Sequence, residues 1–171
     1  MFDFLRKKQE ELFTPQIYDW MKQKQIQKYE DIFPKISNYL KPEFNVLDIG
    51  IGKAWLEEFF EQKNIKFSKI VGVDVNEKMI TPKKIGIQYI LSSNFKTKEK
   101  FDLVICFDSL HLLKDHEIVS FVKPGGFFLI SLPERWKDQL EFFRNYVIIA
   151  EGEIGQDEID YFIFGKPYLS K

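Results

Sequence analysis

The segment NVLDIGIGKAW, residues 45–55, places an acidic side chain and two glycines at the end of an apolar run. A buried carboxylate without a partner costs free energy, and glycine lets the backbone approach a ligand closely. Asp48, Gly50 and Gly52 therefore predict a turn that binds a small polar group. A helix expected to begin near Ala54 directs its free N–H groups toward the same place.

A second acidic residue, Asp74, ends the next apolar run, KIVGVDV. In dinucleotide-binding folds a carboxylate at this position accepts hydrogen bonds from ribose hydroxyls. The alternative interpretation is that Asp74 only starts a turn and that Asn76 caps a helix. Two acids that end consecutive strands on either side of a glycine turn favour a nucleoside ligand.

The glycine spacing also indicates which kind of nucleoside is bound. The dinucleotide pattern G-x-G-x-x-G needs a glycine at position 55, where this chain has Trp55. Asp48 would in addition repel a phosphate group. We therefore expect a nucleoside ligand that carries no phosphate.

Candidates for acid–base chemistry lie in FDLVICFDSLHLL, residues 101–113. Asp108 and His111 are the candidate catalytic residues, because either side chain can accept a proton at neutral pH. His111 could instead pack under the following helix. A metal site of Asp108, His111 and His116 is a further alternative, but Asp115 is typical of a helix N-cap, so these residues would not share one face. We expect no metal.

Five short apolar runs rich in β-branched residues predict the strands of a parallel sheet that is covered on both faces. The predicted strands are Asn45–Ile49, Lys69–Val73, Ile87–Leu91, Phe101–Phe107 and Phe127–Leu132. Helices are expected at Ala54–Lys63, Glu77–Ile80 and His116–Val122. The short link from Ser92 to Lys100 is expected to hold no helix.

The two ends of the chain differ from this alternation. Residues 1–40 predict helices interrupted at Pro15 and Pro34, with Asp31 as the cap of the later helix. A helix over Glu134–Arg144 is expected to precede an antiparallel hairpin. Its strands are Tyr146–Glu151 and Ile159–Phe164. The whole chain is expected to form one α/β domain of three parts: 1–40 with the N-terminal helices, 41–132 with the cofactor-binding core, and 133–171 with the last helix and the hairpin.

The composition argues against several classes of protein. The net charge of −1 lacks the basic excess of a nucleic-acid-binding domain, so we do not expect nucleic acid as a partner. The single cysteine, Cys106, cannot form an internal disulfide. No apolar run approaches the roughly 18 residues of a membrane span, and the N-terminus is charged where a signal peptide is apolar. These features predict a cytoplasmic protein without a membrane partner.

Four segments resemble motifs of the class I S-adenosylmethionine-dependent methyltransferases, of the methyltransferase-11-like kind. VLDIGIGKA is similar to their acid-x-Gly-x-Gly-x-Gly turn, with Ala54 in place of the last glycine. IVGVDVNEKM resembles their second strand and FDLVICFDSLHLL the segment at their fourth. VKPGGFFLISLP resembles the turn and the fifth strand. The motifs occur in the family's order within residues 36–132.

This resemblance implies a fold, a cofactor and a set of site residues. The fold is a Rossmann-like α/β sandwich, with a mostly parallel seven-stranded sheet that ends in an antiparallel hairpin and has helices on both faces. The cofactor is S-adenosyl-L-methionine, with S-adenosyl-L-homocysteine as product. The implied cofactor-binding residues are Asp48, Ile49, Gly50, Gly52, Asp74, Val75, Met79, Ser93, Asn94 and Phe107.

Individual roles also follow from the resemblance. Asp74 would bind the ribose, and Val75 and Met79 would lie near the adenine. Many relatives have Gly-Asp-Ala after the third strand, where this chain has Ser-Ser-Asn; Ser93 or Asn94 would then accept from the adenine amino group. The segment after the fourth strand would lie beside the methionine part of the cofactor and the substrate.

Three functions stay open at this level. The leading hypothesis is methyl transfer to a small molecule. A protein or RNA methyltransferase is an alternative, because the chain has almost no insertion that could cap a small substrate. A non-catalytic, cofactor-binding regulatory subunit is another, on account of Ala54 and the Ser92–Asn94 turn. The sequence predicts neither the methyl acceptor nor the oligomeric state.

Overall fold

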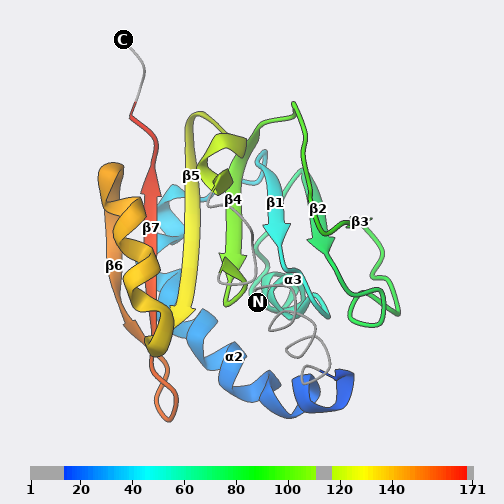
Figure 1. The fold of residues 1–171 in the computed structure, drawn as a ribbon. Helices are drawn as coiled ribbons and strands as arrows, with labels where there is room; N and C mark the ends of the chain where they lie inside the picture. The colour runs from blue at the N-terminus through cyan, green and yellow to red at the C-terminus, as the bar shows by residue number, and fades with distance from the viewer. Residues whose placement is uncertain (1–13, 111–116, 169–171) are drawn as a thin grey trace.

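The fold is known from a computed structural model, which describes residues 14–110 and 117–168. A seven-stranded sheet has the order β3-β2-β1-β4-β5-β7-β6 (Figure 1). The strands are β1 (Asn45–Ile49), β2 (Lys69–Asp74), β3 (Ile87–Leu91), β4 (Phe101–Phe107), β5 (Val122–Pro133), β6 (Val147–Ile154) and β7 (Asp160–Lys166). Strands β1 to β5 pair in parallel, and β7 is antiparallel to both β5 and β6. The predicted sheet with its terminal antiparallel hairpin is confirmed.

The strand order reverses next to β1. From β1 the chain continues outward through β2 and β3, and then returns to place β4 on the other side of β1. Asp48 of β1 is consequently aligned with Gly72 of β2 and Ile105 of β4. In open α/β sheets the crevice at such a reversal, beyond the carboxyl ends of the strands, is where ligands bind.

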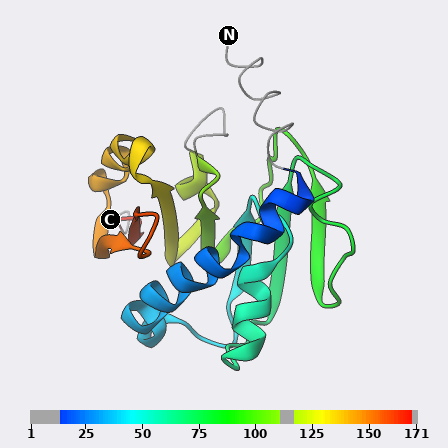
Figure 2. The ribbon, with the colours of Figure 1, turned by 90° about the horizontal axis from the view of Figure 1, so that it is seen from below.

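Helices cover both faces of the sheet, as the continuous apolar strands require. The helical elements are α2 (Pro15–Ile36), η1 (Ser37–Tyr39), α3 (Trp55–Gln62), η3 (Glu117–Phe121) and η4 (Glu134–Asn145). Helices α2 and α3 pack together on one face of the sheet, and the 3₁₀ helices η3 and η4 cover the other (Figure 2). Ile105 and Phe107 of β4 are buried in the core cluster on the α2 and α3 side, and Val104 and Cys106 are buried in the cluster on the η3 and η4 side. Strand β4 is therefore buried on both sides.

Helix α2 begins at the first of the two expected breaks. Pro15 occupies its first turn, where a proline lacks only an N–H that would have no partner inside the helix. The Thr14 side chain caps this end by accepting the Ile17 N–H at 3.4 Å.

The break expected at Pro34 is wrong, because α2 continues through this residue to Ile36. A proline inside a helix costs about 3 kcal/mol. Complete burial of Ile32 and Ile36 in the core offsets that cost. The expected cap at Asp31 is also wrong: this carboxylate lies inside α2 and accepts the Gly155 N–H at 2.8 Å, which ties α2 to the β6–β7 connection.

Two further boundaries differ from expectation. Residues 77–80 form turns and no helix, because the Asn76 side chain accepts the Lys78 N–H at 3.0 Å in a local turn. Strand β5 begins at Val122, before the glycines that were expected to precede it. The segment between Ser92 and Lys100 has no helix, as predicted.

Within the described residues, none of the helices has both the length and the apolar character that crossing a membrane requires.

Candidate functional site

A cavity of about 770 Å³ lies at the edge of the sheet where β1, β2 and β4 end. Helix α2 runs along this edge (Figure 1). It contributes Met21, Gln25, Lys28 and Tyr29 to the wall of the cavity. All the residues expected to bind the cofactor line the cavity: Asp48, Ile49, Gly50, Gly52, Asp74, Val75, Met79, Ser93, Asn94 and Phe107. The topology thus brings together residues as far apart in the sequence as Asp48 and Phe107.

The glycine turn after β1 depends on two backbone conformations that favour glycine. Gly50 and Gly52 have φ angles of 82° and 54°. A Cβ atom on Gly50 would lie 2.1 Å from the Ser109 Oγ atom, so a side chain there clashes with the segment after β4. The Gly50 N–H donates to the Val73 carbonyl at 2.7 Å, which fixes the turn against β2.

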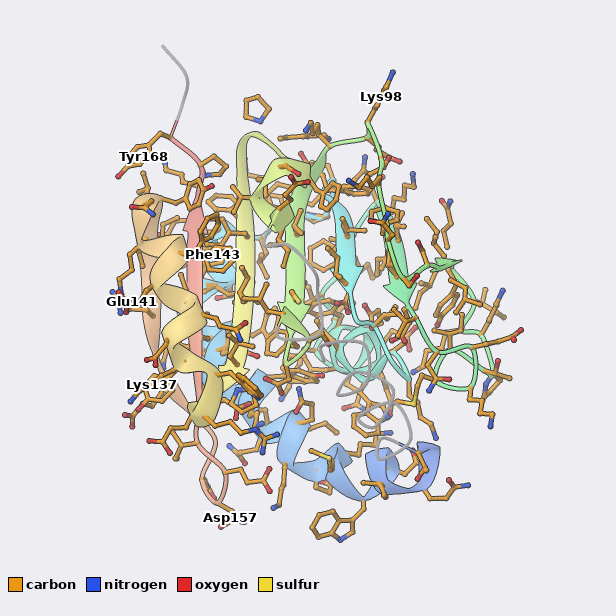
Figure 3. All side chains as sticks on the ribbon, in the orientation of Figure 1. Lys98, Lys137, Glu141, Phe143, Asp157 and Tyr168 are labelled. Atoms are coloured by element: carbon orange, nitrogen blue, oxygen red, sulfur yellow. The ribbon has the colours of Figure 1, made fainter. Side chains whose placement is uncertain are left out.

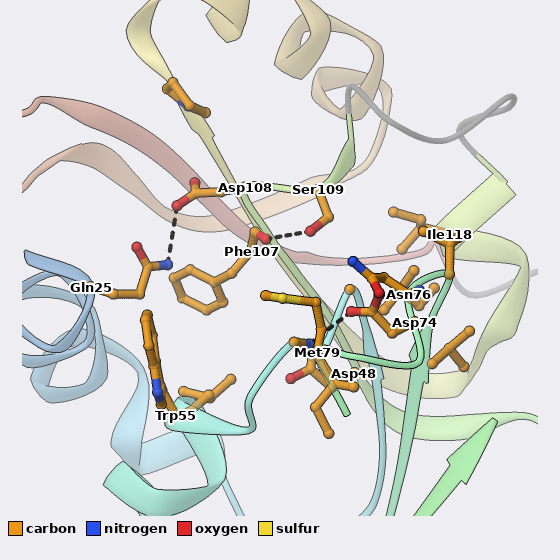
Figure 4. Close-up of a pocket in the computed structure, with 18 of the residues that line it drawn as sticks. Gln25, Asp48, Trp55, Asp74, Asn76, Met79, Phe107, Asp108, Ser109 and Ile118 are labelled. Carbon is orange, nitrogen blue, oxygen red and sulfur yellow. Dashed lines mark hydrogen bonds between the residues drawn. The ribbon is translucent and has the colours of Figure 1, made fainter. Parts of the chain in front are cut away.

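Asp74 is anchored by backbone groups at the end of β2. Its Oδ2 atom accepts the Gly52 N–H and its Oδ1 atom the Asn76 N–H, each at 2.9 Å (Figure 4). Burial raises the pKa of Asp74, and these hydrogen bonds act in the opposite direction. A carboxylate has about four acceptor sites, so Asp74 retains capacity for hydroxyl donors in the cavity.

Beside the glycine turn, the carboxyl groups of Asp48 and Glu57 are buried together, and the two residues are 4% and 3% exposed. Two carboxylates can only accept, and neither Glu57 oxygen has a donor among the described residues. A proton shared by the two acids supplies that donor. Burial, followed by the charge of Glu57, raises the pKa of Asp48 well above its ordinary value, and burial raises the pKa of Glu57 to about 7. The pair therefore holds a proton near neutral pH.

Asp108 lies at the end of β4 with a φ angle of 52°, which residues other than glycine rarely adopt. Its Oδ1 atom accepts from Ser131 Oγ at 3.0 Å, and its Oδ2 atom accepts from Gln25 Nε2 at 3.1 Å (Figure 4). The side chain is 23% exposed and lines the cavity. Contacts from β5 and α2 therefore hold this carboxylate at the cavity wall. His111, the other candidate catalytic residue, and His116 lie outside the described residues.

Lys28 of α2 connects Asp108 to a second buried acid. It forms an ion pair with Asp160, the first residue of β7, and its Nζ atom lies 3.6 Å from Asp108 Oδ2. Burial acts to lower the pKa of Lys28, but Asp108 and Asp160 together hold it above the ordinary value. Burial, and then repulsion by Asp108, raises the pKa of Asp160 to about 7. This arrangement was not expected from the sequence.

The sequence pattern of α2 contains a feature that could have identified its residues in this cluster. Gln25, Lys28 and Tyr29 share one face with the buried Ile32 and Ile36, at spacings of three and four residues. Polar side chains on such an apolar face need partners, which makes them candidates for a site. Their partners could not be identified in this way.

The metal alternative of Asp108, His111 and His116 includes two residues that lie outside the described part of the chain. Across residues 14–110 and 117–168, no group of three or more His, Cys, Asp or Glu side chains could hold a metal ion.

Residues 21–153 match the protein family described as methyltransferase domain. The chain belongs to this family. It is a methyltransferase of the S-adenosylmethionine-dependent class I superfamily, whose methyl donor is S-adenosylmethionine. A comparison with curated protein sequences gave no significant match.

Solved structures with the same fold are distant in sequence. The magnesium protoporphyrin IX methyltransferase of Synechocystis, solved with S-adenosylmethionine bound, superposes with a TM-score of 0.64 at 14% identity, over 84% of this chain and 79% of that one. The ribosomal protein L11 methylase of Lactobacillus delbrueckii gives a TM-score of 0.62 at 16% identity, over 82% and 79%. A chain from the complex of a Haloferax volcanii methyltransferase with its Trm112 activator gives 0.70 at 11% identity, over 90% and 94%. These likenesses concern the fold.

Proposed function

We propose that this methyltransferase transfers the methyl group of S-adenosylmethionine to a small-molecule acceptor that enters beside Asp108. The observation that carries the proposal is the cavity at the strand ends, which is lined by the Asp74 carboxylate at the end of β2 and by the Asp108 carboxylate after β4. Its volume of about 770 Å³ lies within the range of ligand pockets for small molecules.

The residues around Asp74 suit an adenosyl group. The Asp74 carboxylate would accept hydrogen bonds from the ribose hydroxyls, and Val75 and Met79 would contact the adenine. Ser93 and Asn94 line the same part of the cavity and would bind the adenine amino group. The sulfonium of the cofactor supplies an activated methyl group, and the protein has to align an acceptor with it, which accounts for much of the rate in such displacements.

Two observations favour a small acceptor over a protein or RNA. Helix α2 lines the cavity with Met21, Gln25 and Tyr29, so part of the N-terminal region encloses the space in which a small acceptor would bind. Among the described residues, eight acidic and three basic side chains line the cavity, and this excess of negative charge repels the phosphates of RNA.

We also propose a cytoplasmic location, in keeping with the free, buried Cys106.

The cofactor part of the proposal is tested by the substitution Asp74→Asn. Hydrogen bonds to a charged group contribute roughly 1.5–3 kcal/mol each, and 1.4 kcal/mol corresponds to a tenfold change in affinity. We expect Asp74→Asn to weaken S-adenosylhomocysteine binding at least about tenfold in calorimetry. Asp138→Asn, an exposed substitution in η4 away from the cavity, is the control. Unchanged affinity in the folded Asp74 variant would remove this residue from the cofactor site.

The acceptor part is tested by transfer of labelled methyl groups. Wild-type protein and labelled S-adenosylmethionine are incubated with a metabolite fraction, a protein fraction and an RNA fraction of a cell extract. We expect label in the metabolite fraction. Label confined to protein or RNA would contradict a small-molecule acceptor, and no transfer from a bound cofactor would indicate a non-catalytic subunit.

A further inference from the structure

We propose that the methyl acceptor is a small amine that enters as an ammonium ion, and that Lys28 and Asp160 position Asp108 to take a proton from it. This inference rests on the proposed function and deepens it. Asp108 is the catalytic residue in the proposal because it faces the cavity. Lys28 and Asp160 are positioning residues, since their side chains are 4% and 3% exposed and act through Asp108.

The geometry of the cluster leaves one negative charge without a compensating cation. The single ammonium group of Lys28 lies between two carboxylates, in an ion pair with Asp160 and 3.6 Å from Asp108 Oδ2. The other hydrogen bonds of Asp108 come from the neutral groups of Gln25 and Ser131. Because Lys28 compensates only one of the two acids, the cluster favours a second positive charge, or a proton, on its cavity side.

The charge of the surrounding wall favours the same class of acceptor. The part of the cavity wall that includes Asp108 also includes Glu134 and residues of the β6–β7 connection. Asp157 lies at the tip of this connection (Figure 3). Glu158 of this connection pairs with Lys24 of α2 at 2.9 Å, and Arg135 is the basic neighbour on η4. A wall in which acids outnumber bases concentrates cations and repels carboxylate or phosphate acceptors.

The proposed step balances atoms and electrons. The acceptor ammonium gives one N–H proton to the Asp108 carboxylate, which leaves a lone pair on nitrogen. This lone pair forms the new C–N bond to the methyl carbon while the S–C bond breaks, and the electron pair of the broken bond goes to sulfur. The products are a methylated ammonium ion and neutral S-adenosylhomocysteine. The proton stays on the aspartate cluster until it passes to water.

The cluster gives this step a defined dependence on pH. The groups that face Asp108 are Lys28 from α2 and Asp160 from β7, and Glu158 of the β6–β7 connection acts on Lys28. Since the pKa of Asp160 is raised to about 7, the cluster holds an extra proton below that pH and can accept one above it. The rate of methyl transfer to an amine should rise as pH increases through about 7.

The chemical class of the acceptor is tested with matched compounds. Labelled S-adenosylmethionine and the wild-type protein are incubated with several hundred small primary and secondary amines, and with the alcohol and the carboxylate of each carbon skeleton. We expect methylation of amines and not of their alcohol or carboxylate counterparts. Transfer only to alcohols or carboxylates overturns the inference, as does the absence of any methylated amine from a protein that binds S-adenosylhomocysteine. A protein that does not bind S-adenosylhomocysteine refutes the proposed function itself.

The roles of the three residues are tested by conservative variants with the best amine. Asp108→Asn should lower turnover by roughly 10²–10⁴-fold, the usual contribution of a general base. Asp160→Asn removes the group whose pKa is raised to about 7, so the rise of rate with pH should disappear from the range around pH 7. Glu30→Gln, an exposed substitution on α2 that breaks only the pair with Lys63, should leave the profile unchanged.

A purely structural role for the cluster predicts a different result. In that case Asp160→Asn would lower the melting temperature and leave the pH profile of the folded protein in place. The carboxyl carbon signal of Asp160, followed by NMR in the S-adenosylhomocysteine complex, gives a readout that needs no acceptor. We expect its titration midpoint near 7, and a midpoint near the ordinary value of an aspartate overturns the inference.

Discussion

At the residue scale, the cavity region contains two pairs of acids whose charges are compensated in different ways. Asp48 and Glu57 are both buried, and the described part of the chain provides no donor to Glu57. Asp108 and Asp160 have Lys28 between them, so their mutual repulsion is partly compensated. We therefore expect the first pair to weaken the fold when it loses its proton, whereas the second pair is the one proposed to exchange a proton with a ligand.

The first pair makes a prediction about stability. The folded-state pKa of Glu57 is raised to about 7 from an ordinary value of 4.5. Its contribution to stability is therefore fully present below about pH 4.5 and is lost as pH rises to about 7. The other groups that act on Glu57 are Asp48 and Lys84, and Tyr89 of β3 lies near enough for its own pKa to be raised by Glu57.

Glu57→Gln should remove this loss, because its amide donates to Asp48 without a titrating proton. Above pH 8 we expect the variant to be more stable than the wild type by about 3 kcal/mol, and the difference should vanish near pH 4.5. Chemical denaturation at several pH values measures it. Glu61→Gln, an exposed substitution on α3, is the control. A pH-independent difference would mean that Glu57 and Asp48 do not share a proton.

At the scale of elements, α2 has two functions. Its apolar face packs on α3 through contacts such as Phe33 on Phe60, with ring centroids 5.1 Å apart. Its polar side chains Gln25 and Lys28 extend from the same face to the acids at the end of β4 and the start of β7. The helix that stabilises the core therefore also forms one wall of the site.

Pro34 makes α2 less stable than its packing allows, and Pro34→Ala tests this. The proline is exposed and lacks the N–H that would bond to the carbonyl four residues earlier. Alanine restores this bond, but it also raises the conformational entropy of the unfolded chain. That increase lowers the free energy of unfolding by about 0.4–1 kcal/mol. With about 3 kcal/mol for an interior proline, we expect a net stabilisation of about 2 kcal/mol and a higher melting temperature. The control Gln23→Ala should change little, and a destabilised Pro34→Ala variant would show that the ring itself packs favourably.

At the scale of the whole molecule, charge is distributed unevenly. The chain as a whole carries a net charge of −1, yet the described wall of the cavity has eight acidic and three basic side chains. The basic residues are therefore concentrated elsewhere. We expect this asymmetry to attract a cationic cofactor to the strand ends, by an electrostatic attraction that weakens as salt is added.

The acidic cavity wall predicts different salt dependences for two ligands that differ mainly by one positive charge. S-adenosylmethionine carries a sulfonium and a net positive charge, whereas S-adenosylhomocysteine is neutral overall. Raising the salt concentration from about 0.05 to 0.5 M shortens the Debye length several-fold. We expect the affinity for S-adenosylmethionine to fall several-fold more than that for S-adenosylhomocysteine in calorimetry. Equal salt dependence of the two would show that the acidic wall does not act on the cofactor.

The local sequence alone determined the glycine turn, the acids at the ends of β1 and β2, and the strands of the sheet. These features depend on backbone conformations and apolar runs within a few residues, such as Gly50 after Ile49, and such short-range preferences are visible in any window of the chain. Their gathering in one cavity then follows from the parallel order of the strands. Whether the gathered residues bind the cofactor stays a prediction.

Only the tertiary structure decided which side chains lie opposite the glycine turn and the acids at the strand ends. Lys28 and Asp160 are 132 positions apart, and their contact depends on how α2 crosses the strand ends. The continuation of α2 through Pro34 likewise depends on burial of Ile32 and Ile36 against elements that follow much later in the chain. A local pattern can mark Lys28 as a polar residue on an apolar face. It cannot identify the partner, because the free energy of a buried ion pair is set by the three-dimensional arrangement of its neighbours.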